Sequence, residues 1–201
     1  MINKTLRFGS CYHFYHFGNP REAIFRLEED YYSFLDMFRK YLYPVVWLYA
    51  YCLLPTHFHL LLRVKEKRKI DYVYSNPEMV TTQFSNLFGA YTKHVNQRYH
   101  RSGSLFDGGS PRELPRKKQL ICDLVVYIHL NPQIYGVVSD FRHWPFSSCY
   151  AYLRQDRRSM IAKELLLDPQ SYKRILELHG TPRLCVMDWE GGSDYMKDEG
   201  S

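Results

Sequence analysis

Two apolar runs near the middle of the chain dominate its hydrophobic pattern. They cover Val45–Leu54 and Thr56–Val64, and Pro55 separates them. Their nearly continuous apolar character predicts two strands at central positions of a sheet, because such strands are covered on both faces. The same region is apolar enough to suggest a membrane span. Its prolines and its two histidines, His57 and His59, favour two strands and a turn instead.

The flanking segments predict two further strands and three helices. Cys11–Phe17 is aromatic-rich and strand-like, and Glu28–Leu42 has apolar residues near helical spacing. Glu78–Arg98 is amphipathic with the same period. A Gly-rich segment, GSLFDGGSPRELP, predicts a short strand with a loop. Arg116–Asn131 then predicts a third helix, which we expect the following proline, Pro132, to end.

The order of these elements is that of a ferredoxin-like fold. Strand, helix, strand, strand, helix and weak strand give the βαββαβ order, and therefore an α+β fold with an antiparallel sheet and helices on one face. The third helix and a C-terminal helical extension would be additions to it. We expect an N-terminal arm at 1–10, a main domain at 11–155 and the extension at 156–188, with a helix at Pro169–His179. The polar, Gly/Ser-rich tail at 189–201 is expected to be disordered.

Composition and charge narrow the class of protein. The 201 residues are 45% hydrophobic, which predicts a folded domain of ordinary size. A net charge of +6 suits a polyanionic partner, and the 18 tyrosines and 12 phenylalanines supply rings that could stack on bases or fill the core. Five scattered cysteines without a CxxC pair, and an N-terminus without an apolar signal segment, predict a cytoplasmic protein with reduced thiols and no membrane association.

His57 and His59 are candidate metal ligands. Side chains at i and i+2 of a strand point to the same face, so both imidazoles would project side by side. Neighbouring imidazoles with an open face suit a divalent metal. Such pairs are also common by chance, and by themselves they are more often inert residues of a sheet edge.

The third helix carries residues that could complete a site. Tyr127 and Asn131 are four positions apart and share one helix face. The helical period places both at one border of the apolar stripe, where they could still meet solvent, and it places His129 near the opposite border. Two imidazoles and an amide oxygen would give a metal three protein ligands. A metal so held would polarise a phosphodiester, and a neighbouring tyrosine could attack phosphorus.

Two segments resemble a known family. YCLLPTHFHLLL and VVYIHLNPQIYGVVSDFRHWPFSSCYAYL are similar to the single-tyrosine HUH transposases, and the YIHLNP and WPFSS pieces are most similar to the REP-associated tyrosine transposase branch. The segment YHFYHFGNPREAIF also resembles the first strand of that group. The similarity extends from Cys11 to Leu153. One departure is the Gly- and Pro-rich segment GSLFDGGSPRELP, where relatives have a more basic strand.

The resemblance implies an activity and a role for each candidate. His57 and His59 match the HUH metal pair, Asn131 the third metal ligand and Tyr127 the nucleophile, with Mg²⁺ or Mn²⁺ as the metal. The implied reaction is cleavage and strand transfer of single-stranded or hairpin DNA through a 5′-phosphotyrosine, without ATP. Members of the family act as monomers or homodimers.

Basic residues near these motifs are candidate phosphate contacts. One group lies at the start of the third helix, where positive side chains are unfavourable with the helix dipole unless an anion binds there. A solvated charged surface is the alternative interpretation. The candidates are Lys65, Lys67, Arg68, Lys69, Arg98, Arg112, Arg116, Lys117 and Lys118, with Arg101 as a weaker one.

Three other functions fit the same residues. The protein could be a domesticated DNA-binding protein that no longer transposes, or a nickase similar to relaxases and replication initiators. It could also be a metal-dependent hydrolase that uses the histidines alone. A covalent DNA adduct that depends on Tyr127 would separate the transposase and nickase from the other two.

Overall fold

The computed structural model describes residues 5–18, 22–106, 112–114, 118–154 and 159–162. The helix and the tail expected after residue 162 therefore lie outside the described residues. Of the arm, Leu6 is fully buried, and its backbone N–H donates to Thr81 Oγ1 at 3.0 Å. Residues just before the first strand are thus part of the core packing.

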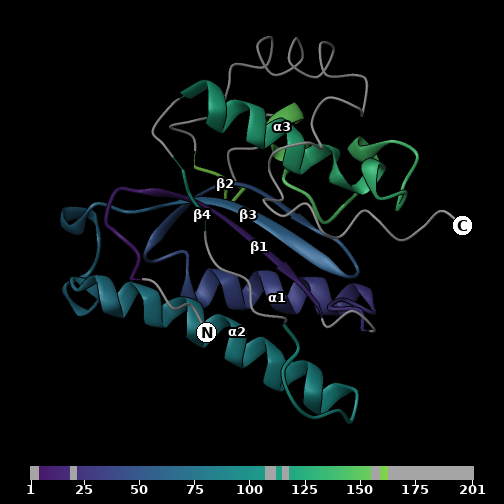
Figure 1. The fold of residues 1–201 in the computed structure, drawn as a ribbon, viewed down its shortest axis with the longest axis horizontal. Helices are drawn as coiled ribbons and strands as arrows, with labels where there is room; N and C mark the ends of the chain where they lie inside the picture. The colour runs from purple at the N-terminus through teal and green to yellow at the C-terminus, as the bar shows by residue number, and fades with distance from the viewer. Residues whose placement is uncertain (1–4, 19–21, 107–111, 115–117, 155–158, 163–201) are drawn as a thin grey trace, which may run out of the picture.

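A four-stranded antiparallel sheet forms the centre of the fold (Figure 1). Its strands are β1 (Cys11–Phe17), β2 (Val46–Leu53), β3 (His57–Val64) and the short β4 (Arg112–Leu114), in the spatial order β2-β3-β1-β4. Each neighbouring pair is antiparallel. With α1 between β1 and β2 and α2 between β3 and β4, the predicted βαββαβ order and the α+β class are confirmed.

Helices cover both faces of this sheet (Figure 1). The helices α1 (Glu28–Tyr41) and α2 (Pro77–Arg98) lie side by side on one face, where the Phe14 ring of β1 stacks on Phe84 of α2 at 4.5 Å. The third helix, α3 (Lys118–Ile134), lies across the other face. A short helix, α4 (Cys149–Arg154), follows. Three 3-10 turns complete the described structure: η1 (Lys67–Lys69), η2 (Tyr72–Tyr74) and η3 (Phe141–His143).

The expected end of the third helix was wrong. Pro132 lies inside α3, which continues to Ile134. A proline removes its own N–H donor, but its carbonyl and those before it still accept, so Tyr135 N donates to Asn131 O at 2.9 Å. Two residues after the end of the helix, Gly136 has a φ of 66°, the left-handed conformation that commonly follows a helix. The continuation past Pro132 places Tyr135, directly after α3, on the same side as Asn131.

A buried carboxylate ties the start of α1 to the end of α2. Asp30 is fully buried, and its Oδ2 accepts hydrogen bonds from the backbone N–H groups of Arg26 and Leu27 at 2.9 and 3.0 Å. The Tyr99 hydroxyl, just after α2, donates to the same oxygen at 2.7 Å. These bonds fix how the two helices pack beneath the sheet.

We predict that Asp30→Ala lowers the free energy of unfolding by about 3 kcal/mol, because it leaves several buried donors without an acceptor. Asp36→Ala is the matched control on the same helix. Its side chain is 73% exposed, and we expect a change within about 0.5 kcal/mol. Urea denaturation followed by circular dichroism measures both, and equal effects would contradict the assignment.

Candidate functional site

Strand β3 places the two histidines on the face of the sheet that α3 covers. His57 and His59 are 1% and 0% exposed, and their ring centroids are 5.4 Å apart with the planes at 82°. Phe58, between them, points to the opposite face and contacts Phe34 of α1 at 5.1 Å. The strand alternation expected from the sequence is therefore present.

Helix α3 brings an aromatic and an amide side chain against these imidazoles. The Tyr127 ring meets His59 edge-on, with centroids 5.7 Å apart at 89°. One turn later, Asn131 Nδ2 donates to the Tyr127 carbonyl at 2.7 Å. One further turn on, the Tyr135 ring lies 4.4 Å from His57. The side chains at 127, 131 and 135 thus lie in a row along β3, with Tyr127 beside His59 and Tyr135 beside His57.

Three buried polar atoms at this contact have no hydrogen-bond partner among the described residues. They are Nε2 of His57, Nε2 of His59 and Oδ1 of Asn131. The Asn131 amide lies next to the His59 ring but outside hydrogen-bond geometry. Buried polar groups are normally satisfied, and these are lone-pair donors of the kind that coordinate divalent metals. The donor set therefore fits the metal that the sequence implied.

The other nitrogen of each imidazole has a partner. His59 Nδ1 lies 3.0 Å from His13 Nε2, and the two rings are stacked at 5.3 Å and 8°. His57 Nδ1 lies 3.1 Å from the Thr56 hydroxyl. In metal sites, a hydrogen bond to the second ring nitrogen fixes the tautomer and the ring orientation. His13 and Thr56 can act in this way here.

His13 is a site residue that the sequence analysis missed. It lies in β1, and β1 pairs with β3 so that Tyr15 is opposite His59 and Phe17 is opposite His57. His13, Tyr15 and Phe17 therefore share the face of the two histidines. The alternation in CYHFYHF indicates which β1 residues share a face. Only the register shows that His13 reaches His59.

Burial keeps both β3 histidines uncharged at neutral pH. It lowers the pKa of His57 to about 4. Burial, together with the neighbouring His13 and His57 rings, lowers the pKa of His59 well below its usual value, although the contact with Asn131 acts in the opposite direction. A neutral imidazole keeps its lone pair, which is the form that coordinates a metal.

The expected position of Tyr127 and Asn131 at a solvent border was wrong. Tyr127 is 1% exposed and Asn131 is 0% exposed. His129, expected near the opposite border, is also fully buried, with its Nε2 at 2.7 Å from Ser148 Oγ. The segment ICDLVVYIHL is apolar around almost its whole circumference, and such a helix is covered on all sides.

The predicted DNA-contacting lysines near β3 do not lie beside the histidines. Lys65 is 9% exposed, and its Nζ donates to the carbonyl oxygens of Tyr43 and Pro44 at 2.8 and 3.2 Å. Its Nζ also lies over the Trp47 ring at 4.4 Å, so the ammonium group interacts with other groups of the protein itself. Lys67, Arg68 and Lys69 are exposed in η1, beyond the end of β3 that is remote from His57.

The other predicted basic contacts are spread over three elements. Arg98, at the end of α2, lies 3.5 Å from Glu29 and 3.6 Å from Asp30. Arg112 is the first residue of β4, where its backbone pairs with His13 of β1. Lys118 is the first residue of α3. Arg116 and Lys117 lie outside the described residues.

The described residues contain no group of three or more His, Cys, Asp or Glu side chains arranged to hold a metal. No helix in the described part of the chain has the length and apolarity needed to cross a bilayer.

Comparison with known proteins finds one similar curated protein and one similar solved structure. No protein-family model matches the chain. Over 102 residues it is 29% identical to a putative REP-associated tyrosine transposase of Haemophilus influenzae, covering 49% of this chain and 56% of that protein. The chain thus spans little more than half the length of this curated relative. Among solved structures, a REP-associated tyrosine transposase bound to a REP hairpin matches with a TM-score of 0.49 and 16% identity, over 84% of this chain and 93% of that one.

The buried histidines make stability depend on pH. Burial lowers the pKa of His129 to about 3, and that of His57 to about 4, whereas unfolded histidine titrates near 6.5. Above pH 6.5 both states are neutral and stability is at its full value. As the pH falls from 6.5 towards 3, the unfolded state takes up protons that the folded state does not, so stability is lost.

We predict that His129→Gln reduces the slope of unfolding free energy against pH, between pH 6 and 4, by up to about 1.4 kcal/mol per pH unit. The exposed His143, replaced in the same way, serves as the control and should leave the slope unchanged. Urea titrations at a series of pH values give the slopes. An unchanged slope in His129→Gln would show that this imidazole is protonated in the folded protein.

Proposed function

We propose that this protein cleaves and rejoins single-stranded DNA at a hairpin through a covalent tyrosine intermediate, as a REP-associated tyrosine transposase of the single-tyrosine HUH type. The observation that carries the proposal is the set of three unpaired buried atoms, on His57, His59 and Asn131, beside Tyr127. The similarity to a putative transposase supports it independently of that geometry.

His57, His59 and Asn131 would hold a divalent cation, Mg²⁺ or Mn²⁺. When bound, such a cation polarises the scissile phosphodiester and stabilises the charge that develops on it. The chain's own contribution is to hold the ligands in place. His13 and Thr56 fix the two imidazoles from behind, while the hydrogen bond from Asn131 Nδ2 to the Tyr127 carbonyl leaves the amide oxygen free to coordinate.

Tyr127 would be the nucleophile. Its phenolic oxygen loses its proton and forms a bond to phosphorus, while the bond from phosphorus to the 3′ oxygen breaks and leaves a free 3′-OH. The DNA then stays joined to the enzyme through its 5′ phosphate. Attack by another 3′-OH reverses the step and releases the tyrosine. Because one ester replaces another, no nucleotide cofactor is consumed.

DNA has to open a path to this tyrosine. Tyr127 is 1% exposed, whereas Tyr135, just after the end of α3 and beside His57, is 38% exposed. Tyr135 would therefore meet an entering strand first. The attack is assigned to Tyr127 because it lies beside His59 and Asn131. Tyr135 offers a second phenol near the same histidines, and so a matched control.

The domesticated DNA-binding protein remains the second candidate. Its supporting observation is the same burial of Tyr127, which leaves the nucleophile without direct access in the free protein. The net charge of +6 and the exposed cations of η1 suit DNA in either case.

A labelled hairpin oligonucleotide with single-stranded flanks, incubated with protein and Mn²⁺, should give a covalent adduct that survives denaturing electrophoresis. Tyr127→Phe should abolish it, and Tyr135→Phe should retain it within a few-fold. Peptide mass spectrometry locates the DNA-linked residue. An adduct on Tyr135, or one that persists in Tyr127→Phe, would refute the assignment. Tight binding by the wild-type protein without any adduct would favour the binding protein.

Direct measurement of Mn²⁺ binding tests the proposed metal ligands independently of DNA cleavage. Isothermal titration of the DNA-free protein with Mn²⁺ should show one site, and His57→Ala or His59→Ala should remove it. His13→Phe keeps both ligands but loses the bond to His59 Nδ1, so we expect Mn²⁺ affinity to fall about 10- to 100-fold. His143→Gln, at an exposed position, should bind as the wild type does. Equal Mn²⁺ affinity in all of these variants would exclude this site.

A further inference from the structure

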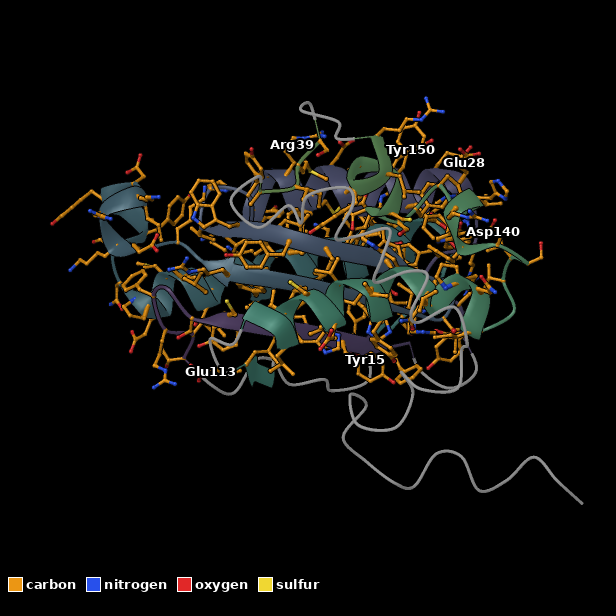
Figure 2. All side chains as sticks on the ribbon, turned by 90° about the horizontal axis from the view of Figure 1, so that it is seen from above. Tyr15, Glu28, Arg39, Glu113, Asp140 and Tyr150 are labelled. Carbon is orange, nitrogen blue, oxygen red and sulfur yellow. The ribbon has the colours of Figure 1, made fainter. Side chains whose placement is uncertain are left out.

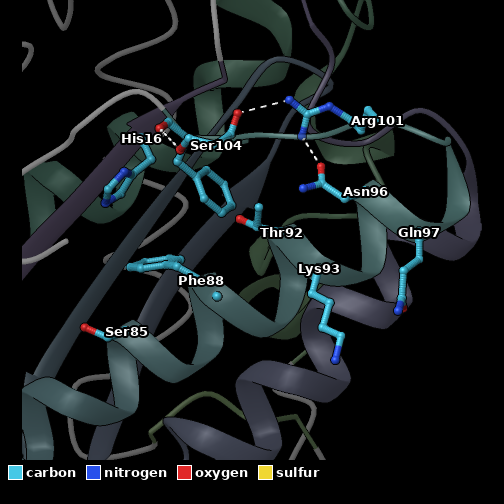
Figure 3. Close-up of a pocket in the computed structure, with 11 residues that line it drawn as sticks. His16, Ser85, Phe88, Thr92, Lys93, Asn96, Gln97, Arg101 and Ser104 are labelled. Atoms are coloured by element: carbon cyan, nitrogen blue, oxygen red, sulfur yellow. Dashed lines mark hydrogen bonds between the residues drawn. The ribbon is translucent and has the colours of Figure 1, made fainter.

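A hollow lies on the face of the sheet opposite to the metal-ligand candidates. It has a volume of about 530 Å³ and is bounded by α2, the segment from Arg101 to Phe106, and His16 of β1 (Figure 3). His16 follows Tyr15 in the strand and therefore points away from His57 and His59. A volume of this size is in the range of small-ligand pockets.

Aromatic rings line part of the hollow. Phe88 of α2 and Phe106 are half-buried, with ring centroids 5.3 Å apart. The buried His16 ring lies 4.9 Å from Phe88 and 5.8 Å from Phe106. Partly exposed rings at the wall of a cavity offer an apolar surface on which a flat group can stack.

Polar side chains from a single stripe of α2 line another part (Figure 3). They lie on the side of the helix away from its core residues, and the stripe is about 18 Å long at 1.5 Å per residue. It supplies hydroxyl and amide groups that can both donate and accept hydrogen bonds. Its polar members are Ser85, Thr92, Lys93, Asn96 and Gln97, and Gly89 lies among them.

The charge of the lining favours an anionic occupant. None of the described residues that line the hollow is acidic. Arg101 is held by Asn96 Oδ1 at 2.6 Å and the Ser104 carbonyl at 3.0 Å, and its charge is balanced by Glu22 at 2.6 Å. Lys93 is exposed and has no ion-pair partner in the described part of the chain, so it supplies the unbalanced positive charge.

Gly89 opens the hollow towards the backbone of α2. It lies in the middle of a 22-residue helix, where glycine is among the least favourable residues. A Cβ built at this position would meet no atom within 4 Å, so packing within the protein does not require glycine here. The missing side chain leaves room for an occupant to approach the helix closely.

We propose that this hollow binds a nucleotide from the single-stranded DNA beside the hairpin. The base lies against Phe88 and Phe106, the phosphate lies near Lys93, and the exposed amide of Gln97 meets a base edge. The proposal rests on the proposed function, because that function supplies the ligand. Phe106 bridges Gly18 just beyond Phe17, and Phe17 is paired with His57. One strand passing this end of β1 could therefore contact both faces of the sheet.

The test fills the hollow from Gly89. Gly89→Leu places a side chain in the open space, while Gly89→Ala is the matched control that leaves most of the volume. Fluorescence anisotropy measures the affinity of each variant for a blunt hairpin and for the same hairpin with a single-stranded flank. We expect Gly89→Leu to weaken binding of the flanked hairpin at least 10-fold and of the blunt hairpin less than 2-fold. Gly89→Ala should change neither by more than 2-fold.

Two results would overturn the proposal. Wild-type affinity of Gly89→Leu for the flanked hairpin would show that the hollow is not used, and equal weakening for both hairpins would place the stem there instead. A flank carrying 5-iodouracil supplies a second measurement, with photocrosslinks expected in the peptides of Phe88 or Phe106. The wild-type adduct assay keeps the two questions apart. A wild type that forms the adduct while Gly89→Leu binds normally refutes only the hollow, whereas a wild type with neither adduct nor DNA binding refutes the function.

Discussion

The contact between β3 and α3 encloses polar atoms that the described residues do not satisfy, and this constraint organises the structure around it. Each buried polar atom without a partner costs on the order of 1–3 kcal/mol. His57, His59 and Asn131 bring three such atoms together. The surrounding packing has to offset that cost: α3 is buried on almost all sides, and seven of the eight residues of β3 are buried. A cation that accepts all three lone pairs would remove the cost.

The sheet divides the molecule into two chemically different halves. Figure 2 shows that α3 lies over the face of the sheet that also carries Tyr15. On β1, His13 and Tyr15 face the histidine pair, whereas Phe14 and His16 face α2. A single alternating strand therefore contributes to the candidate metal site on one face and to the α2 hollow on the other. A shift of one residue in its register would disrupt both places at once.

Much of this arrangement follows from the sequence because it depends on short-range patterns. The apolar runs of β2 and β3, and the apolar periods of α1 and α2, determine each element from residues close in the chain. That His57 and His59 lie on the same face of β3 follows from strand alternation alone. The role of His13 depends on the register between β1 and β3, which no local pattern encodes. The burial of Tyr127 depends on what packs around α3, and Lys65 is drawn inwards by two carbonyl oxygens that lie over 20 residues away in the chain. Tertiary contacts decide these three features.

The burial of Tyr127 has a consequence for the fate of the proposed intermediate. Water competes with the DNA 3′-OH for a phosphotyrosine ester. A tyrosine sealed between a sheet and an apolar helix presents its ester to few water molecules, so a positioned DNA 3′-OH has the advantage. The same enclosure that delays entry of the strand would then preserve the cut end for rejoining. Slow entry of the DNA strand to Tyr127 and protection of the phosphotyrosine from water would both result from the packing of α3 on the sheet.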